Sequence, residues 1–293
     1  MRTDRRKLMV SSRKNDMYEL LGKALRFHPY INNSYSKFIS SWDTSKVTDL
    51  SYCFQGCISL RSLDLSSWDT SKVTDLRGCF QECSSLQSLD LSSWDTSKVT
   101  DLSYCFKECR SLQSLDLSSW DISKLLSLEY TFSNGVNELI MPELSEDNML
   151  KYLYCTWYQN SRIKKLDLSK FNTKNVTEFG WCFEEAVNLE WLDISGFDLS
   201  SATVSGVESF FGRNRMLTHL ILGEGFGKIK EGVTFDMSSF ASLDEESKAS
   251  FMSLYDRKAN GLPNVTLKLK TSFGFSEEQI QSLTNKGYTI NLV

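Results

Sequence analysis

A ten-residue segment, S-W-D-T-S-K-V-T-D-L, occurs three times without change and constrains the fold more than any other feature of this chain. Its tryptophans are Trp42, Trp68 and Trp94, which gives a period of 26 residues, and Trp120 opens a fourth, degenerate copy. Phe171 and Phe197 continue the same column. A fixed period of about 20–30 residues predicts a stacked repeat architecture, in which each unit buries its apolar face only against its neighbours.

Pairs of apolar residues separated by one residue follow the same period. They are Leu63/Leu65, Leu89/Leu91, Leu115/Leu117, Leu139/Met141, Leu166/Leu168, Leu192/Ile194 and Leu220/Leu222, at spacings of 26, 26, 24, 27, 26 and 28 residues. Because side chains of a strand alternate between its two faces, the S-L-D-L-S segments predict leucines in the core and aspartates in solvent.

The rest of each repeat predicts a turn and a return to the core. The Asp-Thr-Ser segment is typical of a turn, since these side chains form hydrogen bonds with nearby backbone groups. Val73 and Leu76 then re-enter the core, and the spacing of Cys79, Phe80 and Cys83 favours a short helical turn. The predicted fold class is α/β: a leucine-rich-repeat-like solenoid of about 7–8 rungs, each a short strand, a turn and a short helical turn.

The two ends differ from the repeats and are expected to cap them. The first 37 residues carry nine Lys/Arg against three Asp/Glu, a net charge of +6, which leaves −10 on the remainder of a chain of net charge −4. The spacing of Leu20, Leu21, Ala24 and Leu25 predicts a capping helix. Beyond the repeats we expect a helix after Ser242, a strand over residues 265–270, a helix from Ser276 and a strand over residues 288–293. The predicted divisions are a basic N-terminal segment with its helix (1–36), the repeat solenoid (37–225) and an α+β C-terminal cap (226–293).

The repeat L-D-L-S-S-W-D-T-S-K-V-T-D-L-x-x-C-F-x-x-C-x-S-L resembles that of the BspA-like leucine-rich repeat family, also catalogued in mycoplasma surface lipoproteins. The resemblance covers residues 37–225, with Trp in place of Phe, and Cys in place of Met before Phe54, Phe80 and Phe106. It implies a binding or adhesive surface protein of a bacterium, a eukaryotic microbe or a phage particle, without catalytic activity. The basic stretch at residues 1–15 lacks the apolar core of a secretory signal. A cell-surface or secreted location, a virion or tail-associated structural or receptor-binding role, and a cytoplasmic interaction module therefore all stay open.

The eight cysteines allow three interpretations. Cys53/Cys57, Cys79/Cys83 and Cys105/Cys109 repeat a C-x-x-x-C spacing, and Cys155 and Cys182 are expected to fall in the first of these two columns. Buried, reduced thiols are favoured because cysteine packs as a small hydrophobe. Disulfides between neighbouring rungs and a metal site are the alternatives.

The aspartates form three columns. One follows the aromatic residue (Asp43, Asp69, Asp95, Asp121), one precedes the leucine (Asp49, Asp75, Asp101), and one lies on the strand. Stacked carboxylates repel unless something offsets their charge. Hydrogen bonds to the backbone of each turn are the favoured answer, and calcium between rungs is the alternative. A parallel lysine column, from Lys46 to Lys124, could also pair with acids. The tryptophan column is interpreted as a packing spine rather than a row of sugar-stacking rings.

The strand face is the predicted binding surface. Its first half is monotonous and polar, and its second half is varied and includes a tryptophan, the residue type that binding hot spots favour. The candidate residues are Asp64, Asp90, Asp116, Ile140, Asp167, Trp191, Asp193 and His219.

No enzyme signature is present: the chain has no G-x-S-x-G, H-E-x-x-H or phosphate-binding loop. We expect a non-enzymatic scaffold that needs no cofactor and no metal and that binds a protein or a glycan. The acidic body disfavours nucleic acid, and no apolar run reaches the length of a membrane span. The oligomeric state is left open.

Overall fold

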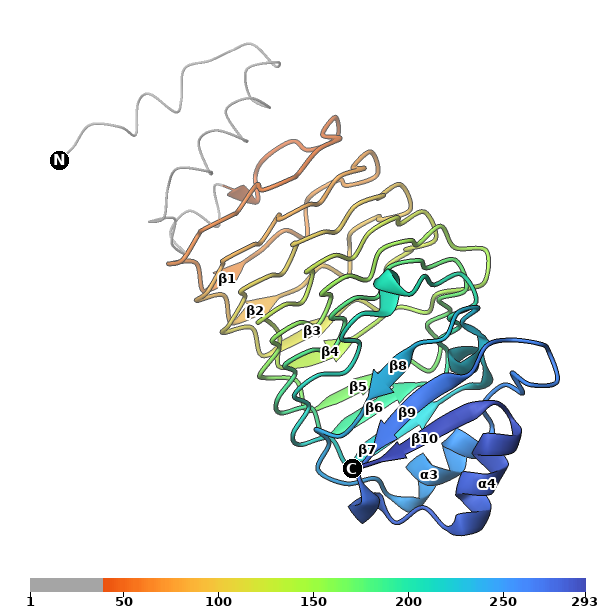
Figure 1. The fold of residues 1–293 in the computed structure, drawn as a ribbon. Helices are drawn as coiled ribbons and strands as arrows, with labels where there is room; N and C mark the ends of the chain where they lie inside the picture. Colours follow the sequence, from red (N-terminus) through yellow and green to blue (C-terminus); the bar gives the residue numbers. More distant parts are fainter. Residues whose placement is uncertain (1–38) are drawn as a thin grey trace.

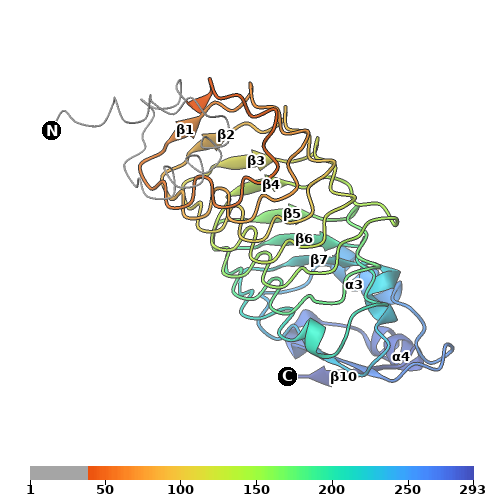
Figure 2. The same ribbon diagram turned by 90° about the horizontal axis from the view of Figure 1, so that it is seen from above.

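A computed structural model describes residues 39–293 as a mixed α/β fold, in which successive coils of the chain stack on one another (Figure 1). The helix predicted around residues 20–25 lies outside the described residues. Short parallel strands mark one side of the stack from β1 to β7, and Figure 2 shows the same coils from above. The sheets of the described part are open, and one hydrophobic core runs from Ile39 to Tyr288.

The strands of this side come from successive repeats. They are β1 (Ser62–Leu63), β2 (Ser88–Leu89), β3 (Ser114–Asp116), β4 (Glu138–Ile140), β5 (Lys165–Asp167), β6 (Trp191–Ile194) and β7 (His219–Leu222). They pair in parallel as β1-β2, β3-β4 and β5-β6-β7, and the register joins equivalent positions such as Leu115 and Leu139. In β3, Leu115 is buried between exposed Ser114 and Asp116, which confirms the predicted alternation.

A second parallel ladder runs along another side of the coils, with one residue from each coil. We call it the bridge column; it consists of Asp49, Asp75, Asp101, Ser127, Tyr152 and Glu178. Val73 and Leu76, which flank it, are buried as predicted. The Leu76 N–H donates to the Asp101 carbonyl at 3.0 Å, so backbone hydrogen bonds join neighbouring coils on two sides.

The predicted helical turn in each repeat is wrong. The C-F-x-x-C segments form successive turns, because the residue before the first cysteine and the residue before the second are left-handed. In one coil these are Gly78 (φ 57°) and Glu82 (φ 61°), and in the next Tyr104 and Glu108 (both φ 63°). Two left-handed residues four apart interrupt a right-handed helix. Backbone bonds to the next coil, such as Phe80 N–H to Cys105 O at 2.9 Å, replace helical ones.

Two columns of aromatic rings fill the core. The first runs through Phe54, Phe80, Phe106, Phe132, Trp157 and Phe183, with successive ring centroids 5.1–6.1 Å apart. The second stacks Trp42, Trp68, Trp94 and Trp120 at 6.2–6.3 Å. Because Trp68, Trp94 and Trp120 are only 3–4% exposed, these three tryptophans are a packing spine and no sugar can stack on them. Trp42, at the start of the column, is partly buried.

The tryptophan column is interrupted where the repeat is shortest, between Leu115 and Leu139. Leu144 takes the tryptophan position there and pairs with Phe171 in the next coil. An open cavity of about 440 Å³ lies beside Leu144, lined by Trp120, Ile122, Leu144 and polar residues that include Glu143 and Lys170. Glu143 and Lys170 form an ion pair.

The C-terminal segment forms a second sheet and two helices. The sheet is parallel, in the order β10-β9-β8, from β8 (Thr234–Asp236), β9 (Val265–Leu269) and β10 (Tyr288–Leu292). The helices are α3 (Glu245–Met252) and α4 (Glu277–Asn285), and short 3-10 segments lie at η2 (Ser205–Val207), η3 (Glu224–Lys228) and η4 (Thr271–Phe273). The two predicted helices and two predicted strands are confirmed, whereas β8 was not expected.

Helix α3 ends the row of strands that begins with β1. Asp244 caps the helix by accepting from the Ser247 N–H at 2.8 Å. The Ser247 and Ser250 hydroxyls in turn accept the N–H groups of Leu220 and Leu222, at 2.9 and 3.2 Å. Serine hydroxyls thus satisfy the edge of β7 in place of another strand, and the exposed edge is closed.

No helix within residues 39–293 combines the length and the apolar character needed to cross a lipid bilayer.

Candidate functional site

The aspartates of the strand face are held by their own turns. In each of Asp64, Asp90, Asp116, Asp167 and Asp193, Oδ1 accepts the backbone N–H of the serine two residues later, at 2.8–3.1 Å. Asp64, Asp90, Asp116 and Asp167 are exposed, because the neighbouring leucines occupy the core. The row of carboxylates is interrupted at Ile140, which holds the same position in β4.

The other aspartate columns use the same bond. Asp69, Asp95 and Asp121 accept from the serines two residues on at 2.9–3.0 Å, and Asp101 accepts from Ser103 at 2.8 Å. These local bonds stabilise each carboxylate within its own turn. No three metal-ligating side chains converge anywhere in the described part of the chain. The lysine column does not pair with acids at Lys72 and Lys98, whose Nζ atoms donate to the carbonyls of Ser45 and Ser71 in the preceding coil.

These turns predict a loss of stability in acid. Hydrogen bonds from the serines lower the pKa of the Asp95 and Asp121 carboxyls below their usual 3.8. A group whose pKa is lower in the folded state stabilises the fold above its unfolded pKa and loses that contribution as the pH falls. Glu129 and Glu184, whose pKa values burial raises, act in the opposite direction but are fewer.

We expect the melting temperature to fall steeply below about pH 4. The double variant Asp95→Asn/Asp121→Asn, which keeps the acceptor oxygens, should show a smaller drop in melting temperature between pH 6 and pH 3. A pH dependence identical to that of the parent protein would contradict this assignment.

The repeated coil is also what relates this chain to known proteins. A family model described as "Mycoplasma protein of unknown function, DUF285" matches residues 15–140 and 151–222, more than half of the chain. The chain belongs to this family. No curated protein matches it. The ten residues between the two matched DUF285 segments, 141–150, include Leu144, where the tryptophan column is interrupted.

The cysteines of the DUF285 coils are buried, and two of them donate hydrogen bonds between coils. None of the eight forms a disulfide. The Cys83 and Cys109 thiols donate to the carbonyls of Phe54 and Phe80 in the preceding coil, each at 3.1 Å. In later coils, the side-chain amides of Asn160 and Asn214 donate to Phe132 and Phe183 at 3.0 and 2.7 Å. Asparagine thus replaces cysteine in the same role, which identifies the column as structural.

One predicted column assignment is wrong. Cys155 does not continue the column of Cys53, Cys79 and Cys105. The Phe106 and Phe132 N–H groups donate to Thr131 and Thr156 carbonyls, so these threonines hold the cysteine position, and Cys182 follows them. Cys155 instead has a left-handed backbone (φ 54°), like Tyr130 one coil earlier. Thr131 and Thr156 are 25 residues apart, one fewer than the usual 26, which spacing alone did not reveal.

The thiols provide a direct test of this arrangement. Burial raises the pKa of Cys57 to about 11 and that of Cys109 to about 12, and it suppresses the reactive thiolate. In the native protein at pH 8 we expect less than about one thiol to react with Ellman's reagent within an hour. Without reductant, all eight should react once the chain is unfolded in guanidinium chloride. Fewer than eight after unfolding would indicate disulfides, and rapid native reaction would contradict the burial.

The second half of the predicted strand face is brought together, but its members differ in exposure. The register places Ile140 beside Asp116, and Asp167 beside Asp193. Ile140 is 55% exposed. His219, by contrast, is only 9% exposed, so it is not an open contact residue as predicted.

Trp191 and His219 contact each other, and each contacts one further side chain. The two rings stack with centroids 5.1 Å apart, Lys165 Nζ lies 4.2 Å from the Trp191 centroid, and His219 Nδ1 lies 2.6 Å from Asp244 Oδ2. Lys165 of β5 and Asp244 at the start of α3 were not among the predicted site residues. His219 and Lys165 therefore cover part of the Trp191 ring, which is intermediate in exposure.

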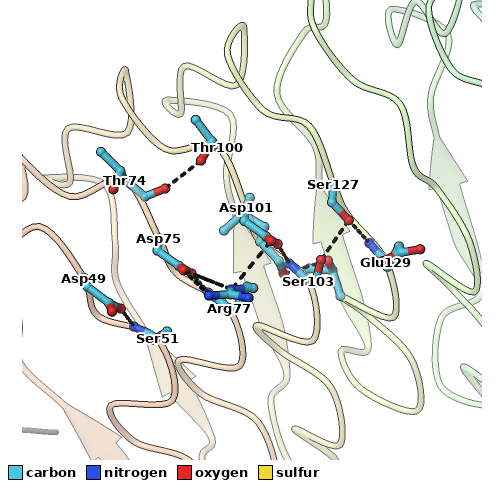
Figure 3. A network of polar contacts seen from close by, with 12 residues as sticks. Asp49, Ser51, Thr74, Asp75, Arg77, Thr100, Asp101, Ser103, Ser127 and Glu129 are labelled. Atoms are coloured by element: carbon cyan, nitrogen blue, oxygen red, sulfur yellow. Dashed lines mark hydrogen bonds and ion pairs between the residues drawn. The ribbon is translucent and has the colours of Figure 1, made fainter.

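The bridge column carries a polar network of its own (Figure 3). The Arg77 guanidinium donates to Asp75 at 2.6–3.1 Å, and its Nε lies 3.6 Å from Asp101 in the next coil. The hydroxyls of Ser103 and Ser127 are 2.7 Å apart, and the Glu129 N–H donates to Ser127 at 3.2 Å. This side of the coils was not among the predicted binding surfaces.

Proposed function

We propose that this chain is a non-enzymatic binding scaffold, and that its coils form a leucine-rich-type solenoid of the BspA-like kind. The parallel register, the repeated L-x-L strands and the continuous core support the solenoid. The scaffold holds a protein or a glycan by many weak contacts along the strand face, and it requires no cofactor.

The observation that carries the proposal is the row of Asp64, Asp90 and Asp116. These carboxylates are exposed, chemically identical and oriented by the same serine bond, at a strand spacing of about 4.8 Å. Because the surface is ordered before it binds, little conformational entropy is lost on association. Such a row suits a ligand that is itself repetitive and carries donors at intervals.

The binding test compares two rows of the same coils. Purified full-length chain is passed over immobilised extracellular-matrix proteins and mucin glycans, together with Asp90→Asn/Asp116→Asn and the control Asp95→Asn/Asp121→Asn. Both pairs lose two charges and keep the turn acceptors. We expect about a tenfold weaker interaction for the strand-face pair and less than a twofold change for the control. Equal losses, or no binding by the parent chain, would count against the strand face.

We infer from the resemblance a cell-surface or secreted adhesion role. A second candidate, an intracellular interaction module, is favoured by the eight unbridged cysteines, because free thiols are typical of reducing compartments. Protease treatment of intact source cells, followed by immunoblotting, separates the two. Cleavage on intact cells supports adhesion, and protection until the cells are lysed supports the intracellular role.

A further inference from the structure

A strip of partly exposed aromatic rings borders the downstream half of the bridge column. We call Tyr104, Tyr130, Tyr154 and Trp181 the aromatic strip. Tyr104 and Tyr130 stack at 5.0 Å, whereas Tyr154 meets Tyr130 and Trp181 edge-to-face at 5.7 and 5.2 Å. All four side chains are intermediate in exposure, unlike the buried phenylalanine column behind them. The strip therefore presents aromatic surface to solvent across successive coils.

Carboxylates line the same side. Asp101 and Glu178 belong to the bridge column, and Glu129 lies between them along the stack. Within residues 39–293, neither Glu129 nor Glu178 forms an ion pair. Burial, followed by repulsion from Asp101 and Glu178, raises the pKa of the Glu129 carboxyl. A cation at this position would be attracted by Glu129 and Glu178, whereas Asp101 already lies 3.6 Å from Arg77 Nε.

The molecule already binds its own cations in this setting. One coil before the strip, the Arg77 guanidinium lies between Asp75 and Asp101. Tyr52 is near it, since the Tyr52 ring lies over Gly78, the residue that follows Arg77. Within the strip, Lys107 Nζ is 5.5 and 5.1 Å from the centroids of Tyr104 and Tyr130. Acid and aromatic groups of this side thus hold a guanidinium and an ammonium group within the chain.

We propose that the aromatic strip, together with Asp101, Glu129 and Glu178, docks an arginine-rich extended segment of a partner protein. Guanidinium groups suit this surface because they bind carboxylates through two parallel hydrogen bonds and also pack on aromatic rings. The strip runs along the stack, so an extended segment meets a new coil about every 4.8 Å. This surface is separate from the strand face, and the proposal does not depend on the function assigned to that face.

The test uses the full chain and a fluorescein-labelled peptide of four Arg-Gly repeats, with Lys-Gly and Glu-Gly peptides of equal length. Fluorescence anisotropy at physiological salt should show saturable binding of the arginine peptide, several-fold weaker binding of the lysine peptide and none of the acidic one. The double variant Glu129→Gln/Glu178→Gln should weaken arginine-peptide binding about tenfold. Tyr154→Leu should weaken it by a smaller factor, with the melting temperature checked for each variant.

The matched control is Asp95→Asn/Asp121→Asn, which removes two charges from the turn column outside both the aromatic strip and the strand face. Its binding should change by less than twofold. Equal weakening by both double variants would overturn the proposal, because net charge alone would then explain the binding. Absence of saturable binding by the parent chain would also overturn it. Displacement of the probe by cellohexaose would assign the strip to a glycan instead, and displacement by a peptide of residues 1–15 would assign it to the chain's own basic segment.

Discussion

Replacing Phe106 by alanine is expected to lower the free energy of unfolding by about 3–5 kcal/mol, one of the largest effects of any single substitution in this chain. Phe106 is fully buried in the middle of the phenylalanine column. The centroid of its ring lies 5.7 Å from that of Phe80, 5.9 Å from that of Phe132 and 6.3 Å from that of Trp120. The rigid backbone on both sides prevents the coils from closing on the cavity. Urea unfolding followed by circular dichroism measures the change.

The reason for the size of this effect is the one-dimensional packing of repeats, in which each coil is stabilised only by its two neighbours. Loss of the Phe106 ring weakens the contacts of its coil with both neighbouring coils. The coils on either side are then less strongly coupled, so unfolding of the variant should also become less cooperative. Ile58→Ala is the control, because Ile58 is 50% exposed and its loss should cost under about 0.5 kcal/mol. A Phe106→Ala effect below about 1 kcal/mol would contradict the packing described here.

Replacing Arg257 by methionine is expected to destabilise the C-terminal sheet by about 3–5 kcal/mol. The side chain is fully buried. Its guanidinium donates to the carbonyls of Gly227 and Ile229 at 2.6 and 2.7 Å, and Nε donates to the carbonyl of Pro263 at 2.8 Å. Methionine leaves these buried acceptors without donors, at a cost of about 1–3 kcal/mol each before relaxation. Hydrogen exchange of β9 and urea unfolding both report the effect.

Arg257→Lys separates charge from geometry. Lysine keeps the positive charge but lacks the planar arrangement of donors that reaches both sides of the site. We expect a loss intermediate between the parent protein and the methionine variant. If lysine restored full stability, the charge rather than the hydrogen-bond geometry would account for the role of Arg257. A methionine variant as stable as the parent would show that the sheet does not depend on this residue.

Periodicity alone predicted that equivalent positions of successive repeats stack in columns, because equal spacing places chemically identical side chains beside each other. Leu115 pairs with Leu139 even though the coil between them has only 24 residues. The same argument predicted the Asp–Ser turns, since that hydrogen bond is local and spans two residues. It did not predict the left-handed residues at Tyr104 and Glu108, because neither is glycine and apolar spacing suggests a helix equally well.

The candidate site was less predictable than the fold. Asp64, Asp90 and Asp116 are exposed as expected, because strand alternation decides their direction. His219 is buried against Trp191 and Asp244, two residues from other parts of the chain, and no local pattern encodes that contact. The aromatic strip was also missed, because Tyr130 and Tyr154 fall in different columns and meet only after the short coil shifts the register.

The sequence by itself determined the repeating unit: its period, the residues that face the core and the turns that aspartate and serine close. These follow from local chemistry and from side-chain alternation, which act within a few residues. Only the tertiary structure decided how the unit folds between its turns, which columns continue through the short coil, and that α3 rather than a further strand ends the row at β7. Each of these depends on contacts between residues about 25 or more positions apart, such as the bond from Leu220 N–H to the Ser247 hydroxyl, and such contacts exist only once the coils are stacked.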